Sequence, residues 1–324
     1  MDDRDPATLP AATRLAFEAA RELGMQTEVL DPEYGYLFEI RAGAKRRVFL
    51  GGRSPLNDAI AARLAQDKHY TSLLLARAGL GVPETARCLA PHHPGYREGA
   101  GLEPGLRLAE TLGGTAVVKP NRLSHGRGVS FVRDAAELVE AIHEVWELDS
   151  LALVQSYEEG TDIRLDFLDG TFLAGYERRE IVIEGDGERT VEVLMESIDP
   201  RMGEPSARRR LMVALAPALE SRGWSTETVV PAGQTLSLAS PIRNLNLGST
   251  PVVIDTPAPH LLETCLAAGK ALGLRHFGVD LRDAAGRVSI IEVNASPLLT
   301  QLFLGGHRER AIAAQTRVLA AAMR

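Results

Sequence analysis

The sequence has few cysteines, no excess of positive charge and no long apolar run, and each shortage excludes a class of protein. Its two cysteines, Cys88 and Cys265, match no metal-binding spacing, and their scarcity indicates a reducing compartment or indifference to redox conditions. The formal net charge of −7 gives no electrostatic footprint of a general nucleic-acid-binding protein and disfavours adhesion to anionic membranes. No stretch approaches the ~18 uninterrupted apolar residues that a transmembrane helix requires.

The composition is that of an ordinary soluble globular protein. Hydrophobic residues make up 45% and charged residues 24% of the 324 residues, enough for one large core or several subdomains. The acidic stretch at residues 1–5 is followed by no apolar segment, so we expect no signal peptide and a cytoplasmic protein. We expect neither nucleic acid nor membrane as a partner.

Stretches with helical periodicity alternate with short strand-like stretches, and no internal repeat is present. Tight turns join the strand-like stretches over 163–183, and a turn of sequence Asp-Ala-Ala-Gly closes a hairpin of 276–282 with 287–294. These antiparallel connections predict an α+β fold rather than a doubly wound parallel sheet. The segment Gly51–Pro55 predicts a boundary after a small N-terminal α/β unit. Helical patterns cover residues 10–23, 57–78, 104–112, 134–148, 207–221, 259–272 and 307–322.

The closing hairpin carries three oxygen-bearing side chains that could meet. Residues two apart on a strand face the same side, so Glu292 and Asn294 point together while Ile291 and Val293 face the core. Asp280 lies on the neighbouring strand, and cross-strand neighbours are within the ~5–8 Å that a bridging divalent ion can span. Hard oxygen ligands of this kind suit magnesium with a nucleoside triphosphate. The hairpin predicts a metal site, and the alternative is an exposed hairpin face that is merely polar.

A lysine ends an apolar strand at Val117-Val-Lys119-Pro, and a loop rich in glycine and basic residues follows. A semi-buried ammonium needs an anion, and a phosphate oxygen suits it. The loop could fold over that phosphate with backbone N–H groups freed by its glycines. It lacks the Gly-Lys-Ser/Thr ending of a P-loop, and its alternative interpretation is an exposed turn. The candidate phosphate-binding residues of the loop are Ser124, His125, Gly126 and Gly128.

Six segments in the same order resemble the ATP-grasp superfamily, and within it the ATP-grasp module of cyanophycin synthetase and of bifunctional glutathione synthetases. Each segment is a weak signal alone, and their shared order over roughly residues 54–302 makes the resemblance specific. The segments are Asp67-Lys68 with Ala78–Pro83, Lys119 with its loop, Val154–Arg164, Arg178 with Gly185-Asp-Gly187, Asn246–Asp255, and the closing hairpin.

The resemblance implies an ATP-grasp fold, in which two α+β lobes clasp ATP, preceded by a short α/β N-terminal domain. It implies an N-terminal domain at residues 1–55 and an ATP-grasp domain at 56–324. Within the latter, a lid subdomain covers about 80–154 and a C-terminal lobe about 155–324. Homodimers are common among similar enzymes.

The resemblance also implies roles for individual residues. Lys68 and Lys119 match the two phosphate-binding lysines, and Arg178 matches an arginine near the acyl phosphate. The alternative for Arg178 is a solvated surface residue beside Arg179, and Asn246 could satisfy a loop rather than touch substrate. The residues implied in ATP binding are Lys68, Lys119, Ser124, His125, Gly126, Gly128, Gln155 and Tyr157 at adenine, and Asp162 at the ribose hydroxyls. The residues implied for magnesium, with manganese as an alternative ion, are Asp280, Glu292 and Asn294. The resemblance implies a catalytic role for Arg178 and Lys119. It implies substrate contacts for Arg178, Asn246 and Ser296.

The implied activity is an ATP-dependent carboxylate–amine ligase that forms an amide or peptide bond through an acyl phosphate and releases ADP and phosphate. Its substrates would be amino acids or small peptides. Two alternatives stay open, an ATP-grasp phosphotransferase and a nucleotide-binding regulatory protein without catalysis. The sequence departs from the family at Gln155, where glutamate is usual, and at Glu180-Ile181, where Pro-Ala is usual.

Overall fold

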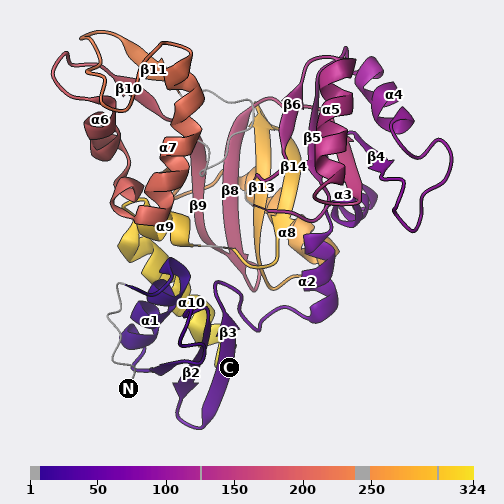
Figure 1. Ribbon diagram of the computed structural model, residues 1–324. Coiled ribbons are helices and arrows are strands. Elements are labelled where there is room, and N and C mark those ends of the chain that lie inside the picture. Colours follow the sequence, from indigo (N-terminus) through magenta and orange to yellow (C-terminus); the bar gives the residue numbers. More distant parts are fainter. Residues whose placement is uncertain (1–7, 125, 238–248, 298) are drawn as a thin grey trace.

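The computed structural model describes residues 8–124, 126–237, 249–297 and 299–324, and Figure 1 shows them arranged around a five-stranded sheet. All pairings in this sheet are antiparallel, which confirms the predicted α+β class and the closing hairpin. In spatial order, its strands are β12 (Ser249–Val253), β9 (Thr171–Glu180), β8 (Thr161–Leu168), β13 (His276–Ala284) and β14 (Arg287–Asn294).

The two faces of this sheet differ because apolar and charged residues alternate along β8 and β13. Leu165, Phe167 and Val279 lie on one face, where they share an apolar core with helix α8 (Pro259–Leu272). The opposite face is lined with aspartate and arginine side chains. Burial of the first face holds the sheet on its helix, and the second face is available for chemistry.

A four-stranded sheet lies beside the edge strand β14 and forms a separate layer (Figure 1). Helices α4 (Glu103–Thr111) and α5 (Ala135–Trp146) cover one of its faces, with Cys88, Val118 and Ile142 in the core between them. The other face is turned toward the central sheet. It carries Lys119, whose Nζ donates a hydrogen bond to the Ile291 carbonyl of β14. In spatial order, the strands are β4 (Thr85–Leu89), β7 (Leu151–Gln155), β5 (Ala116–Pro120) and β6 (Ser130–Val132).

The helical pattern at 57–78 forms two helices rather than one. Helix α2 (Ala59–Gln66) ends before Asp67, and α3 (Lys68–Arg77) begins after it. Asp67 has an extended backbone, and its carboxylate accepts a hydrogen bond from the Tyr70 N–H at 3.1 Å, so it caps the second helix. Because periodicity continues across the cap, the pattern alone does not reveal the break.

The N-terminal unit is completed from the other end of the chain. Its apolar side chains Phe38 and Ile40 share one core with Val318 and Leu319 of the C-terminal helix. A short helix, α9 (Thr300–Leu304), precedes that helix. The elements of the unit are α1 (Ala11–Glu22), β1 (Gln26–Val29), β2 (Leu37–Ala42), β3 (Lys45–Leu50) and the C-terminal α10 (Arg308–Ala322).

A further small unit lies between β9 and β12 and has its own apolar core, which includes Ile183, Met195 and Leu215. It consists of β10 (Val182–Glu184), α6 (Val191–Ile198), a 3₁₀ turn (Pro200–Gly203), α7 (Pro205–Glu220) and β11 (Thr235–Ser237). None of the helices in the described ranges combines the length and the apolar character needed to cross a membrane.

Candidate active site

The side chains predicted to bind metal meet at the edge of the central sheet. Asp280 and Glu292 are direct cross-strand partners, and Asn294 pairs with Gly278. Asn294 Nδ2 donates a hydrogen bond to Asp280 Oδ2 at 3.1 Å. The structure thus brings together the three side chains that the hairpin pattern selected.

A β-bulge lies beside Glu292. Asp280 pairs with Glu292 whereas Leu281 pairs with Ile290, so Ile291 is an extra residue on β14. Ile290 therefore occupies the core position, which corrects the expectation that Ile291 faces the core. The Ile291 carbonyl instead accepts a hydrogen bond from Lys119 Nζ at 3.4 Å, and this contact joins β5 to β14.

Two lysines approach this edge from the neighbouring layer and from α3. Lys68 Nζ lies 3.7 Å from Glu292 Oε1 and donates a hydrogen bond to the Leu123 carbonyl at 2.6 Å. Lys119 is buried, and burial lowers the pKa of its ammonium to about 8, although the charge of Glu292 opposes the shift. Two ammonium groups and three oxygen-bearing side chains therefore converge, and a triphosphate there would provide the lysines with anionic partners.

Arg178 lies behind this edge on the charged face of the sheet. Its guanidinium bridges Asp162 and Asp280, and its side chain is only 13% exposed. The alternative of a solvated surface arginine is therefore wrong for Arg178. The description fits its neighbour Arg179, which is 57% exposed and pairs with Glu177.

The network continues through further buried charges. Arg164 bridges Asp166 at 2.6 Å and Asp280 at 2.9 Å. Burial alone would raise the pKa of the Asp280 carboxyl, but the charges of Arg164 and Arg178 together outweigh it, and the pKa is lowered. Asp280 is thus an anion held between two guanidinium groups.

Arg164, Asp166 and Arg282 were not among the residues expected at the site. A signal was present, because charged and apolar residues alternate from Asp162 to Phe167 and so place the charges on one face. Alternation within one strand does not tell which residues of β13 lie opposite those of β8. The pairing register sets Arg164 opposite Asp280 and Asp162 opposite Arg282, where the charges compensate each other.

Asp162 is engaged on both carboxylate oxygens. Oδ1 accepts a hydrogen bond from Arg178 at 2.6 Å, and Oδ2 lies 3.1 Å from Arg282 Nε. Burial raises the pKa of Asp162 even though both arginines oppose the shift. Binding of ribose hydroxyls by Asp162 stays a prediction. Such binding requires its carboxylate oxygens to accept hydrogen bonds from the ribose as well as from the two arginines.

Gly278 leaves space for this network. A Cβ atom there would lie 2.2 Å from Asp166 Oδ1 and 2.4 Å from Arg164 Nη2. We expect Gly278→Ala to lower the free energy of unfolding by about 2–3 kcal/mol, because the buried ion pair must shift. Urea denaturation measures the effect, with Gly203→Ala as control, because a methyl group added at Gly203 meets nothing within 4 Å. Equal destabilisation by both substitutions would contradict the prediction.

His276 at the start of β13 is buried, and its Nδ1 lies 3.0 Å from Ser54 Oγ. Burial, and then the charge of Arg164, lower the pKa of His276 to about 4. Unfolded histidine titrates near pH ~6.5, so the unfolded state binds more protons between about pH 6.5 and 4, and stability falls as pH falls through this window. We expect the free energy of unfolding to drop by about 2 kcal/mol from pH 7 to pH 5 through this residue. In urea denaturation, the free energy of unfolding of His276→Gln should fall by about 2 kcal/mol less than that of the wild type between pH 7 and pH 5. An unaltered pH profile would show that His276 is not the source of this pH dependence.

The residues predicted to contact adenine follow β7. Gln155 is buried, and its Nε2 donates a hydrogen bond to Thr85 Oγ1 at 2.7 Å. The Tyr157 ring lies edge-on to Phe131, with centroids 5.2 Å apart, and 5.5 Å from the Arg282 guanidinium carbon. These rings form an aromatic surface between the two layers on which a base could stack. Adenine binding at Gln155 and Tyr157 stays a prediction.

The predicted phosphate loop turns sharply after β5. Gly126 and Gly128 have φ angles of 75° and 69°, in the region that favours glycine. Ser124 accepts a hydrogen bond on its carbonyl from the Arg127 N–H at 3.3 Å. Ser296 follows β14 two residues after Asn294. His125 and Asn246 lie outside the described residues.

The oxygen atoms offered by Asp280, Glu292 and Asn294 are of the kind that a hard cation prefers. In the described part of the chain, no group of three or more His, Cys, Asp or Glu side chains is placed to hold a metal ion. The hairpin set differs in composition because it combines two carboxylates with an amide, all of which offer oxygen atoms to magnesium. Glu292 faces Lys68, whereas Asp280 would have to share its oxygens between the ion and two arginines.

Comparison with known proteins relates this geometry to characterised folds. No family model matches the sequence. The chain is 22% identical over 310 residues to the glutathione biosynthesis bifunctional protein of Desulfotalea psychrophila, and this match covers 89% of the chain and 38% of that protein. It is 26% identical over 309 residues to the cyanophycin synthetase of Trichormus variabilis, and this match covers 90% of the chain and 32% of that protein. The chain therefore spans less than half the length of the relatives it matches.

The fold has a counterpart among solved structures. The crystal structure of a bifunctional glutathione synthetase from Pasteurella multocida superposes with a TM-score of 0.59 and 19% identity, over 91% of this chain and 41% of that one. At this level of identity the likeness concerns the fold. The resemblance seen in the motifs is confirmed by these relatives, and the chain has the ATP-grasp fold.

Proposed function

We propose that the protein is an ATP-dependent ligase that joins a carboxylate to an amine and releases ADP and phosphate. The observation that carries this proposal is the convergence of Lys68 and Lys119 on the edge that holds Asp280, Glu292 and Asn294. Similarity to a glutathione biosynthesis protein and to a cyanophycin synthetase supports it. Amino acids or small peptides are the proposed substrates.

The reaction proceeds in two steps under this proposal. The substrate carboxylate attacks the γ-phosphate of ATP, the bond to ADP breaks, and an acyl phosphate forms. The amine then attacks the acyl carbon, and phosphate leaves. Catalysis of such transfers rests on alignment and on neutralisation of charge rather than on covalent chemistry by the protein.

The residues divide this work by their charges. Lys68 and Lys119 would neutralise phosphate oxygens, and Glu292, Asn294 and Asp280 would hold magnesium, or manganese in its place. When bound, the metal supplies positive charge to the phosphate oxygens.

Arg178 is the group proposed to stabilise negative charge on the acyl phosphate. It comes from β9 and is anchored by Asp162 and Asp280, so its guanidinium is fixed before substrate arrives. The lid, about residues 80–154, would keep water from the acyl phosphate. A cytoplasmic location, where ATP is available, is part of the proposal.

An assay of ADP and free phosphate tests the function. Purified protein is incubated with Mg-ATP and a panel of amino acids, singly and in pairs, and products are identified by mass spectrometry. We expect ADP, phosphate and an amide product in equal amounts, and only for those single amino acids or pairs that supply both the carboxylate and the amine that the site accepts. ADP with a phosphorylated product and no free phosphate would instead indicate a phosphotransferase. Nucleotide binding without turnover for any pair would contradict ligase activity.

A further inference from the structure

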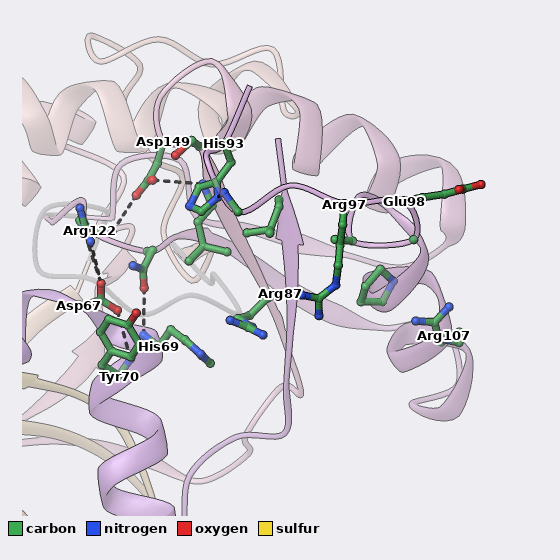
Figure 2. Close-up of a pocket in the computed structure, with 18 residues that line it drawn as sticks. Asp67, His69, Tyr70, Arg87, His93, Arg97, Glu98, Arg107, Arg122 and Asp149 are labelled. Carbon is green, nitrogen blue, oxygen red and sulfur yellow. Dashed lines mark hydrogen bonds and ion pairs between the residues drawn. The ribbon is translucent and has the colours of Figure 1, made fainter. Parts of the chain in front are cut away.

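A cavity of about 550 Å³, drawn in Figure 2, adjoins the candidate active site but has a lining of its own; Asn121 in its wall accepts a hydrogen bond from the Lys68 N–H at 3.3 Å. Its walls come from the start of α3, strand β4, the segment 93–100, the start of α4, residues 121–122 after β5, and the start of β7. Lys68, Lys119, Asp280 and Glu292 do not line it. Its volume lies within the range of small-molecule binding sites.

One side of this cavity is balanced in charge. Arg122 pairs with Asp67, the cap of α3, at 3.1 Å. Asp149 accepts hydrogen bonds from the backbone N–H groups of Arg122 at 2.9 Å and Leu151 at 3.2 Å. These two carboxylates hold the surrounding backbone, and their hydrogen-bonding capacity is largely used.

The other side carries three arginines, Arg87 on β4, Arg97, and Arg107 on α4. Throughout the ranges that the structure covers, none of the three forms an ion pair or a side-chain hydrogen bond. Figure 2 shows Arg97 directed toward Arg87, whereas Glu98 extends away from the cavity. Gathering like charges costs free energy, and an anion bound among these guanidinium groups would offset that cost.

The wall that presents Arg97 is ordered by backbone hydrogen bonds. Leu89 N–H donates to the Ala100 carbonyl at 2.8 Å, and Ala100 N–H donates to the Arg97 carbonyl at 3.0 Å. Ala90 N–H donates to the Ser150 carbonyl at 2.9 Å, which ties this wall to β7. The arginines are therefore mounted on fixed backbone, so little backbone entropy is lost when a ligand binds.

We propose that this cavity binds a small molecule that carries two or more phosphate or carboxylate groups. The planar fork of each guanidinium can hold one such group through two parallel hydrogen bonds. The cavity volume of about 550 Å³ suits a compact polyanion. The proposal is independent of the ligase activity, because it rests on residues outside that site.

Calorimetric titration with pyrophosphate and, separately, citrate tests the proposal and distinguishes phosphate from carboxylate ligands. The proteins compared are the wild type, Arg87→Gln/Arg97→Gln, Lys119→Met and a control, Arg209→Gln/Arg210→Gln. The control removes the same charge from two exposed positions on α7. All four substituted arginines are exposed, and circular dichroism verifies that each variant is folded.

We expect at least one probe to bind the wild type, with affinity that falls as salt rises. Binding should weaken by about 100-fold in Arg87→Gln/Arg97→Gln, about tenfold for each guanidinium that is removed from the anion. It should persist in Lys119→Met and in the control. The absence of binding by both probes would overturn the proposal. Loss of binding in Lys119→Met with retention in the arginine variant would overturn it too, since the anion would then occupy the candidate active site.

Discussion

Replacement of Lys119 by methionine should lower the rate of ADP formation by about 10²- to 10³-fold while the protein stays folded. The ammonium of Lys119 lies at the edge that holds Glu292, where the phosphates are proposed to bind. Methionine keeps the apolar stem of the side chain and removes only the charge. Burial already lowers the pKa of this lysine, so the loss of a buried charge should leave the urea midpoint unchanged or higher.

Two measurements define this test, ADP release under saturating Mg-ATP and substrates, and urea denaturation. Lys270→Met is the matched control, because Lys270 is exposed on α8. Wild-type turnover in Lys119→Met would exclude the proposed role of this residue. The same exclusion follows if the control loses as much activity.

Replacement of Arg178 by alanine should abolish turnover and also lower the free energy of unfolding by about 3–5 kcal/mol. The network contains three arginines and three aspartates, so the substitution leaves one buried carboxylate uncompensated. That carboxylate, at Asp162 or Asp280, will have a raised pKa in the folded variant. The folded variant then binds a proton that the unfolded chain does not, so the stability deficit should shrink as pH falls toward about 5.

The neighbouring residue provides the control for this prediction. Arg179→Ala removes an exposed guanidinium whose ion pair with Glu177 spans 2.9 Å at the surface. We expect it to change the free energy of unfolding by less than about 0.5 kcal/mol and to leave turnover unaltered. A loss of stability in Arg178→Ala no greater than in Arg179→Ala would show that the buried network does not stabilise the fold.

The convergence of Asp280, Glu292 and Asn294 could be predicted from the sequence because all three lie on the two strands of one hairpin. The approach of Lys119 from a separate sheet was implied by its own motif and by the family resemblance, because no strand pattern relates one sheet to another. A period of two fixes which side chains share a face, and a hairpin turn fixes which strand is the neighbour. The bulge at Ile291 could not be predicted in this way. A bulge arises from the pairing of two strands, and one strand read alone gives no sign of it.

The buried charges of Arg164, Asp166 and Arg282 show the same limit at longer range. Each was visible as a charged residue in an alternating strand, which by itself fits a solvated face equally well. The register between β8 and β13 converts these charges into compensated pairs, and it depends on residues more than a hundred positions apart. Local pattern therefore predicted which side chains meet at the edge but not the electrostatic support behind them.

The contribution of α10 to the core around Phe38 and Ile40 bears on how the molecule is made. During synthesis, the first strands emerge from the ribosome while the helix that covers them has yet to be translated. Their apolar side chains must stay soluble, or be shielded by chaperones, until Val318 and Leu319 emerge. The core around Phe38 and Ile40 can thus be completed only after α10 has been translated.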